Sequence, residues 1–164
     1  MTNFIIDQLE FTRRQTLRYV NDISDSTAEK IPTGLRNNIK WNLGHIYVVH
    51  EKFAFSLTNH QTYVPSNFNQ LFDPGTKPSD WTQKDPSMAE LIDLLSEQNV
   101  RIKSILTSNI KEDINPHYHS ASSGLTFKTV EDVLTFSIYH EAMHFATIKN
   151  ILSILNHDAE QRNS

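Results

Sequence analysis

The sequence predicts an all-α protein, a four-helix bundle with one long crossover connection. Four long stretches carry apolar residues at intervals of three or four positions, which places these residues on one face of a helix. These stretches are residues 3–21, 38–57, 88–109 and 129–156. No series of alternating apolar and polar residues indicates strands. The long segment between the second and third stretches allows a crossover rather than a tight turn.

The first predicted helix, residues 3–21, has an apolar face that two charged residues interrupt. The apolar residues of this face are Ile6, Leu9, Leu17 and Val20. Arg13 and Arg14 interrupt their period. A capping-box sequence at residues 26–29 then indicates one short helical turn, and Pro32 and Gly34 break the chain after it.

The second predicted helix, residues 38–57, contains two histidines close to its apolar stripe. The stripe consists of Ile39, Leu43, Ile46, His50, Phe53 and Leu57. His50 therefore lies within the stripe, whereas His45 lies at its edge. Burying an unpartnered polar ring costs roughly 1–3 kcal/mol, so we expect each histidine to have a partner.

The connection after this helix, residues 58–86, contains four of the six prolines of the chain. Ser87 and Glu90 form a strong helix start with Pro86, and the third helix runs from there to about residue 109. Residues 111–128 are expected to form a polar loop. Thr129 then caps the fourth helix.

Bulk composition limits the class of protein. The chain has 164 residues, which suits a single domain over residues 1–164. A net charge of -4 and the lack of a basic patch argue against binding to nucleic acid. The sequence contains no cysteine, so any metal site must use His, Asp or Glu. We find neither a signal peptide nor a membrane span, and we expect a cytoplasmic protein.

His140 and His144 lie one turn apart in the middle of the fourth apolar stripe. Side chains at this spacing point the same way and can bind one metal ion. Hydrogen bonds to core side chains would satisfy the two rings equally well, and the pair alone leaves both alternatives open. A third metal ligand has to come from another helix, and either His45 or His50 could supply it.

The residues between the pair complete an H-E-x-x-H pattern, in which Glu141 could serve as a general base. A metalloprotease is disfavoured because only 20 residues follow His144 and no strands are predicted to hold a peptide. Glu141 could also accept a hydrogen bond from a ligand histidine, or form a polar contact between helices.

The chain resembles the DinB superfamily, the DinB/YfiT-like proteins, in two segments. Residues 37–46, Asn-Asn-Ile-Lys-Trp-Asn-Leu-Gly-His-Ile, are similar to the family's second-helix motif, which ends in its first metal ligand. Residues 139–144, Tyr-His-Glu-Ala-Met-His, are similar to its last-helix H-x-x-x-H motif, and residues 124–127 to its lead-in. Residues 145–148, Phe-Ala-Thr-Ile, depart from the G-Q pair that is frequent there, so substrate choice is expected to differ.

The resemblance implies that His45, His140 and His144 form a three-histidine site for a divalent metal cation inside a four-helix bundle. It also implies a cytoplasmic homodimer, and it selects His45 over His50. Family members with known activity include metal-dependent transferases and isomerases that use low-molecular-weight thiols such as bacillithiol or mycothiol. Imidazole suits Zn, Ni, Cu and Fe, and of these we expect Zn or Ni.

We therefore expect a metal-dependent enzyme, a thiol-dependent S-transferase acting on small electrophiles. A metal held by three imidazoles lowers the pKa of a bound water or binds a thiol as thiolate. Glu141 is expected as the catalytic residue, with Tyr47 and Tyr139 as further proton handlers. The alternatives are a metal-dependent hydrolase of small substrates, a non-catalytic metal-binding bundle, and a metal-free bundle.

Overall fold

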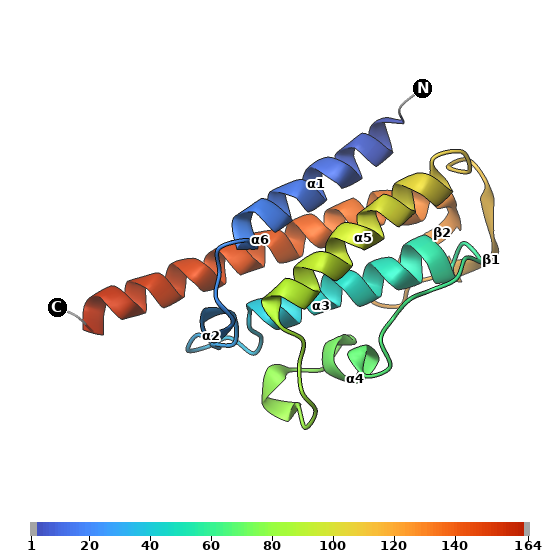
Figure 1. Cartoon of the computed structure of the whole chain (residues 1–164). Coiled ribbons are helices and arrows are strands. Elements are labelled where there is room, and N and C mark those ends of the chain that lie inside the picture. Colours follow the sequence, from blue (N-terminus) through green and yellow to red (C-terminus); the bar gives the residue numbers. More distant parts are fainter. Residues whose placement is uncertain (1–2, 163–164) are drawn as a thin grey trace.

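The structure, a computed structural model, describes residues 3–162 and is mostly helical, with one small sheet (Figure 1). Its four long helices are α1 (Phe4–Val20), α3 (Ile39–His50), α5 (Met88–Leu106) and α6 (Val130–Arg162). Three short helical segments, α2 (Asp25–Ala28), α4 (Phe68–Phe72) and η2 (Pro78–Asp80), lie in the connections. None of the helices among the described residues combines the length and the hydropathy that crossing a lipid bilayer requires.

Capping residues start the long helices where the sequence predicts a start. The side chains of Asn3, Asn38 and Ser87 each accept a hydrogen bond from a backbone N–H in the first turn of α1, α3 and α5. Glu90 completes the capping box of α5 by accepting from the backbone N–H of Ser87. These bonds satisfy amides that a helix end otherwise leaves without partners.

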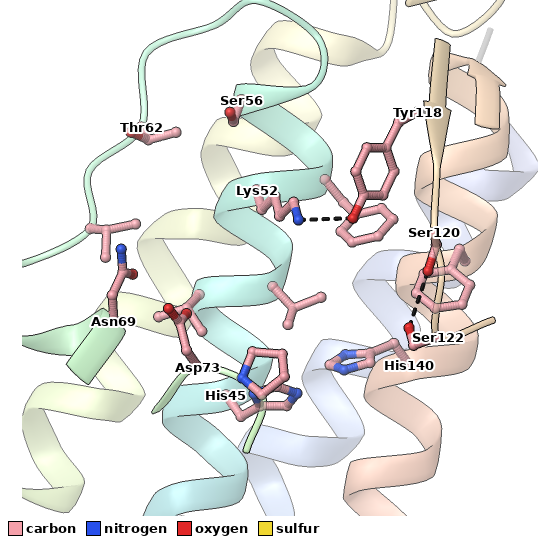
Figure 2. Close-up of a pocket in the computed structure, with 16 residues that line it drawn as sticks. His45, Lys52, Ser56, Thr62, Asn69, Asp73, Tyr118, Ser120, Ser122 and His140 are labelled. Carbon is pink, nitrogen blue, oxygen red and sulfur yellow. Dashed lines mark hydrogen bonds between the residues drawn. The ribbon is translucent and has the colours of Figure 1, made fainter. Parts of the chain in front are cut away.

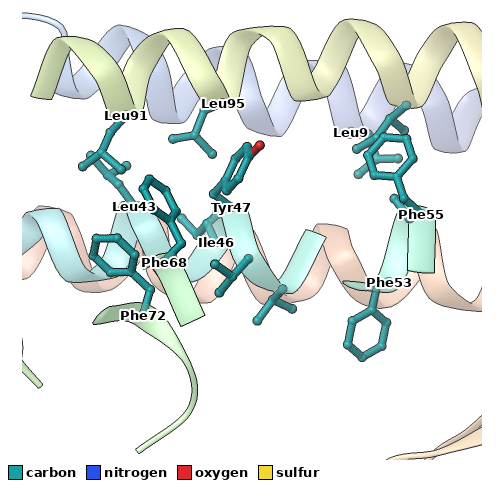
Figure 3. Close-up of a cluster of buried hydrophobic side chains, with 14 of the residues drawn as sticks. Leu9, Leu43, Ile46, Tyr47, Phe53, Phe55, Phe68, Phe72, Leu91 and Leu95 are labelled. Atoms are coloured by element: carbon teal, nitrogen blue, oxygen red, sulfur yellow. The ribbon is translucent and has the colours of Figure 1, made fainter. Parts of the chain in front are cut away.

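The four long helices pack around a common core. Helix α6 lies against α1 and α3, and helix α5 lies against the same two helices from the other side. Leu43, Ile46 and Tyr47 of α3 meet Leu91 and Leu95 of α5 in this core (Figure 3). The short helix α4 adds two buried rings to this core, those of Phe68 and Phe72, whose centroids lie 5.0 Å apart. The crossover connection therefore forms part of the core.

The expectation of an all-α protein is wrong for residues 111–128. Strands β1 (Asp113–His119) and β2 (Thr126–Thr129) pair in an antiparallel sheet with an irregular register between Asp113 and Tyr118. Only Ile114 of β1 and Phe127 of β2 are buried, so the sequence carries too few apolar positions to reveal an alternation. The sheet is held to the helices by Phe127, whose ring packs against the rings of Phe53 and Phe136.

Helix α3 continues into a π-helix, η1 (Glu51–Ser56), where the sequence predicts an unbroken α-helix. The wider turn begins at Glu51, whose side chain is completely buried. This carboxylate accepts hydrogen bonds from Gln98 and Arg101 of α5. Single π-turns inside α-helices occur frequently at functional sites, and this one lies next to the cavity described below.

Candidate metal centre

Three histidines from two helices converge in the interior. His45 comes from α3, and His140 and His144 come from successive turns of α6, which packs directly against α3. One ring nitrogen of each histidine lies within 4.8 Å of the corresponding nitrogens of the other two. All three side chains are buried, with exposed fractions of 6%, 7% and 9%. The structure thus brings together the three residues that the resemblance implies.

Hydrogen bonds fix the tautomers of two of these rings. Nδ1 of His45 lies 2.6 Å from the backbone carbonyl oxygen of Phe72, and a carbonyl only accepts, so Nδ1–H donates. Nδ1 of His144 lies 2.8 Å from Oδ1 of Asn42, whose amide nitrogen donates to the carbonyl of Asn38. Nδ1 of His144 is therefore a donor as well. Both rings keep the Nε2 lone pair for a metal, an arrangement common among metal-binding histidines.

His140 provides a further indication that a ligand belongs here. Its Nδ1 atom is buried and has no hydrogen-bond partner among the described residues. A buried polar atom without a partner costs about 1–3 kcal/mol. A cation coordinated by this Nδ1, or a water that contacts it, would remove this cost. The donor set of three imidazoles fits a divalent metal ion such as Zn or Ni.

Burial keeps the three imidazoles neutral. Burial, as the largest cause, and the neighbouring histidines together lower the pKa of His140 to about 2 and that of His144 to about 4. Burial also lowers the pKa of His45. The hydrogen bond to the Phe72 carbonyl raises this pKa, but by less than burial lowers it. Neutral rings have a lone pair to give, so the centre is ready to bind a cation at neutral pH without first losing protons.

The metal-free protein is expected to lose stability as the pH falls from about 6.5 to about 5. An unfolded histidine takes up a proton in this range, whereas His140 and His144, with pKa values of about 2 and about 4, do not. The unfolded state then binds more protons, so the free energy of unfolding decreases by up to about 1.4 kcal/mol per pH unit for each histidine. Urea unfolding with a chelator present, at a series of pH values, measures the slope.

The matched control for this slope is the substitution of one buried ring. His140→Leu removes one of the lowered pKa values and is expected to give a shallower pH dependence than the wild type. Substitution of the exposed His117 by Gln is expected to leave the slope unchanged. A free energy of unfolding that stays constant between pH 7 and pH 5 would contradict the structure.

Gly44 allows the crossover to approach His45 closely. A Cβ atom at this position would lie 2.4 Å from the ring of Phe72, the residue whose carbonyl holds His45. On the other side, the indole of Trp41 stacks on the His45 imidazole with 4.6 Å between ring centroids. Both contacts come from the segment that carries the resemblance, and both orient the His45 ring.

Gly44→Ala is expected to destabilise the protein by about 1–3 kcal/mol, because the added methyl group displaces the Phe72 ring. This cost outweighs the gain of about 1 kcal/mol that alanine brings to a helix interior. Urea unfolding measures the loss. The double variant Gly44→Ala/Phe72→Leu, in which a smaller side chain makes room, should recover part of it. A single variant as stable as the wild type would show that the ring moves freely.

Glu141, the expected catalytic residue, is held by an arginine. Its carboxylate is completely buried and binds Arg13 of α1 at two points, 2.8 Å from Nε to Oε1 and 2.9 Å from Nη2 to Oε2. Arg13 also donates to the backbone carbonyl of Leu95 and to the side chain of Gln98. Of the three alternatives for Glu141, this geometry favours the polar contact between helices over a free base.

The other candidate residues have partners elsewhere or lie at the surface. The ring of His50 accepts a hydrogen bond from Arg13 at Nδ1 and donates from Nε2 to the carbonyl of Ser137, both at 3.1 Å. His50 is thus a core histidine satisfied by hydrogen bonds. Tyr47 donates its hydroxyl to the carbonyl of Tyr63, and burial raises its pKa to about 12. Tyr139 is 62% exposed.

A cavity of about 640 Å³ opens beside the histidines (Figure 2). His45 and His140 line it at one end, and further polar side chains line its walls. The polar residues of these walls are Lys52, Ser56, Thr62, Asn69, Asp73, Tyr118, Ser120 and Ser122. These residues were not predicted from the sequence, although Lys52 follows His45 by seven residues and so lies two helical turns away on nearly the same face.

A second, more apolar cleft of about 820 Å³ lies between α6 and residues 122–127. Leu125, Phe127, Tyr139 and Met143 contribute to its lining. It shares three residues with the first cavity: Ser122, Phe136 and His140. His140 is therefore reached from two clefts of different polarity.

Comparisons with known proteins gave a family match and a structure of similar fold. The model of the family described as the DinB superfamily matches residues 8–148. A crystal structure of a conserved protein from Enterococcus faecalis has a similar fold, with a TM-score of 0.65 and 14% sequence identity. The similarity covers 94% of this chain and 97% of that one. Comparison with curated proteins found no match.

Proposed function

The chain belongs to the DinB superfamily, and we propose that it is a metal-dependent enzyme that joins a small electrophile to the sulfur of a low-molecular-weight thiol. The observation that carries this proposal is the grouping of three buried, neutral imidazoles at the end of a polar cavity. The candidate ligand group among the described residues contains only these three side chains. Structural zinc sites are normally closed by four protein ligands, whereas catalytic sites use three and keep a position open.

A zinc or nickel ion held by His45, His140 and His144 would supply a Lewis acid that favours the thiolate form of a thiol at neutral pH. In the transfer itself, a sulfur–carbon bond forms and the bond from that carbon to its leaving group breaks. The leaving group departs with the electron pair, and the thiol proton passes to solvent. The protein holds the ligand rings through the Phe72 carbonyl and Asn42, and its clefts position the two reactants.

Two clefts that share His140 support transfer between two organic molecules rather than hydrolysis. A hydrolase needs one organic substrate and water, for which a single cleft suffices. Here the polar cavity suits a hydrophilic thiol compound, and the apolar cleft along α6 suits a hydrophobic electrophile. Hydrolysis of small substrates is the second candidate, because the same metal centre would also lower the pKa of a bound water. A cytoplasmic homodimer, which the family resemblance implies, is also part of this proposal.

The experiment is a thiol-consumption assay with the purified protein loaded with Zn²⁺ or Ni²⁺. Monochlorobimane serves as the electrophile, with a panel of thiols and, separately, p-nitrophenyl esters. We expect turnover with at least one thiol, and we expect chelation of the metal to abolish it. Ester hydrolysis without thiol consumption would favour the hydrolase. If no thiol and no ester reacts in a metal-dependent way, the proposal of an enzyme is wrong and a non-catalytic metal-binding bundle remains.

A further inference from the structure

Lys52 is a cationic side chain on the wall of the polar cavity, in the first turn of the π-helix η1. Its Nζ donates a hydrogen bond of 2.9 Å to the hydroxyl of Tyr118, from β1 on the opposite wall (Figure 2). The same Nζ lies 4.6 Å from the centroid of the Tyr118 ring. Among residues 3–162, no carboxylate oxygen lies within ion-pairing distance of this ammonium group. Its charge is thus balanced by no ion pair of the described chain.

The hydrogen bond between the two residues leaves a second donor available. An ammonium group can only donate, so the Tyr118 oxygen acts as the acceptor. The phenolic O–H then points to a different acceptor, and no described side chain or backbone group accepts from it. An N–H of Lys52 and the O–H of Tyr118 are therefore two neighbouring donors at the cavity wall. Two adjacent donors, one of them charged, match the two oxygens of a carboxylate.

The distance from Lys52 to the three histidines sets the length of a molecule that could contact both. Lys52 follows His45 by seven residues, which corresponds to about 10 Å along the helix axis. Val48 and Val49 line the cavity between them and offer an apolar wall. A molecule that reaches from the histidines to Lys52 thus needs a chain of several carbon atoms between its two polar ends.

The second charged group of the cavity lies at the other end. Asp73 follows Phe72, the residue that holds His45, and it lies close to His45 in Figure 2. Apart from the two histidines, Lys52 and Asp73 are the residues with ordinarily charged side chains in the lining. Lys52 therefore lies farther from the metal ligands than Asp73 does, and no ion pair joins the two. Burial raises the pKa of Asp73, and the charges of His45 and Lys52 act against this increase.

We infer that Lys52 and Tyr118 bind the carboxylate of the thiol substrate while its sulfur lies at the three histidines. The inference rests on the proposed function, which it deepens by assigning the thiol to a class: small acids with several carbon atoms between the thiol and the carboxylate. Neutral thiols of the same length lack the charge that Lys52 recognises. The enzyme accordingly discriminates by the acid group as well as by the sulfur.

The test compares 6-mercaptohexanoate with 6-mercaptohexan-1-ol, two thiols of equal chain length that differ in the acid group. Their dissociation constants are measured on the Co²⁺-loaded protein from the sulfur-to-cobalt absorption band. The wild type should bind the acid at least about tenfold more tightly than the alcohol. In Lys52→Met this ratio should fall to near one, with the affinity for the alcohol unchanged. Tyr118→Phe should give an intermediate ratio.

Controls separate this inference from the proposal on which it rests. Lys30→Met, which removes an exposed lysine outside the cavity lining, should keep the wild-type ratio. If Co²⁺ binds and both thiols give the absorption band with equal affinity, the role of Lys52 is overturned while the metal centre stands. If the ratio is the same in the wild type and in Lys52→Met, the inference is likewise overturned. If Co²⁺ gives no visible spectrum, the proposed function fails, and this inference fails with it.

Discussion

Replacing Arg13 by methionine is expected to destabilise the protein by about 3–5 kcal/mol, the cost of removing one partner of a buried ion pair. Arg13 is 2% exposed and Glu141 is completely buried, so water cannot take over the lost bonds. The substitution also removes the hydrogen-bond donor of His50. The free energy of unfolding in urea measures the effect. The exposed Arg18 lies on the same helix, and Arg18→Met should stay close to the wild type.

The double variant Arg13→Met/Glu141→Leu separates an unpaired charge from a loss of packing. With both charges removed, the interior no longer contains an uncompensated carboxylate, and apolar side chains of similar volume can replace a buried ion pair at little cost. We expect the double variant to be more stable than Arg13→Met alone. If it is less stable, the pair contributes mainly through contacts that the hydrophobic side chains do not restore.

Substitution of a ligand histidine is expected to produce the largest change in metal binding. His45→Ala or His144→Ala should weaken Zn²⁺ binding by more than about 100-fold, since even the loss of a residue that only orients a ligand costs 10–100-fold. The wild type should bind one ion per chain between the three rings. Isothermal titration calorimetry and elemental analysis of the purified proteins measure affinity and stoichiometry.

His50→Gln is the matched control for these variants. His50 is as buried as the ligands and lies 6.4 Å from His140 between ring centroids, yet it is outside the three-histidine group. We expect it to lose stability but to keep one ion per chain. Saturating Zn²⁺ at about 100 times the dissociation constant should stabilise the wild type by about 2.7 kcal/mol and His45→Ala by much less. Equal stabilisation of both proteins would place the ion elsewhere.

The long helices were predictable because their signals are local. Apolar periodicity and capping residues act within one or two helical turns, so both can be read from the sequence. Ser87, for example, caps α5 where the sequence predicts a helix start. The spacing of His140 and His144 is equally local. The strands were missed because their stability comes from Phe127 packing on rings of two helices, a contact between segments that no local pattern displays.

The candidate site depended on contacts between distant segments. Periodicity alone favoured His45 only slightly over His50, because the Phe72 carbonyl that orients His45 lies 27 positions further along the chain. Arg13 looked like an interruption of an apolar face, and its partner Glu141 lies 128 positions away. A positive and a negative residue in the apolar faces of two different helices could have suggested the pair, but not its geometry.

The carbonyl of Phe72 belongs to the crossover, and this gives the connection a thermodynamic role. Because the bond from His45 to this carbonyl forms only when residues 57–87 adopt their native path, the order of that segment and the affinity for the cation are linked. Linkage is reciprocal, so whatever strengthens one must strengthen the other by the same free energy. The crossover therefore couples metal binding to the ordering of the cavity wall that it forms.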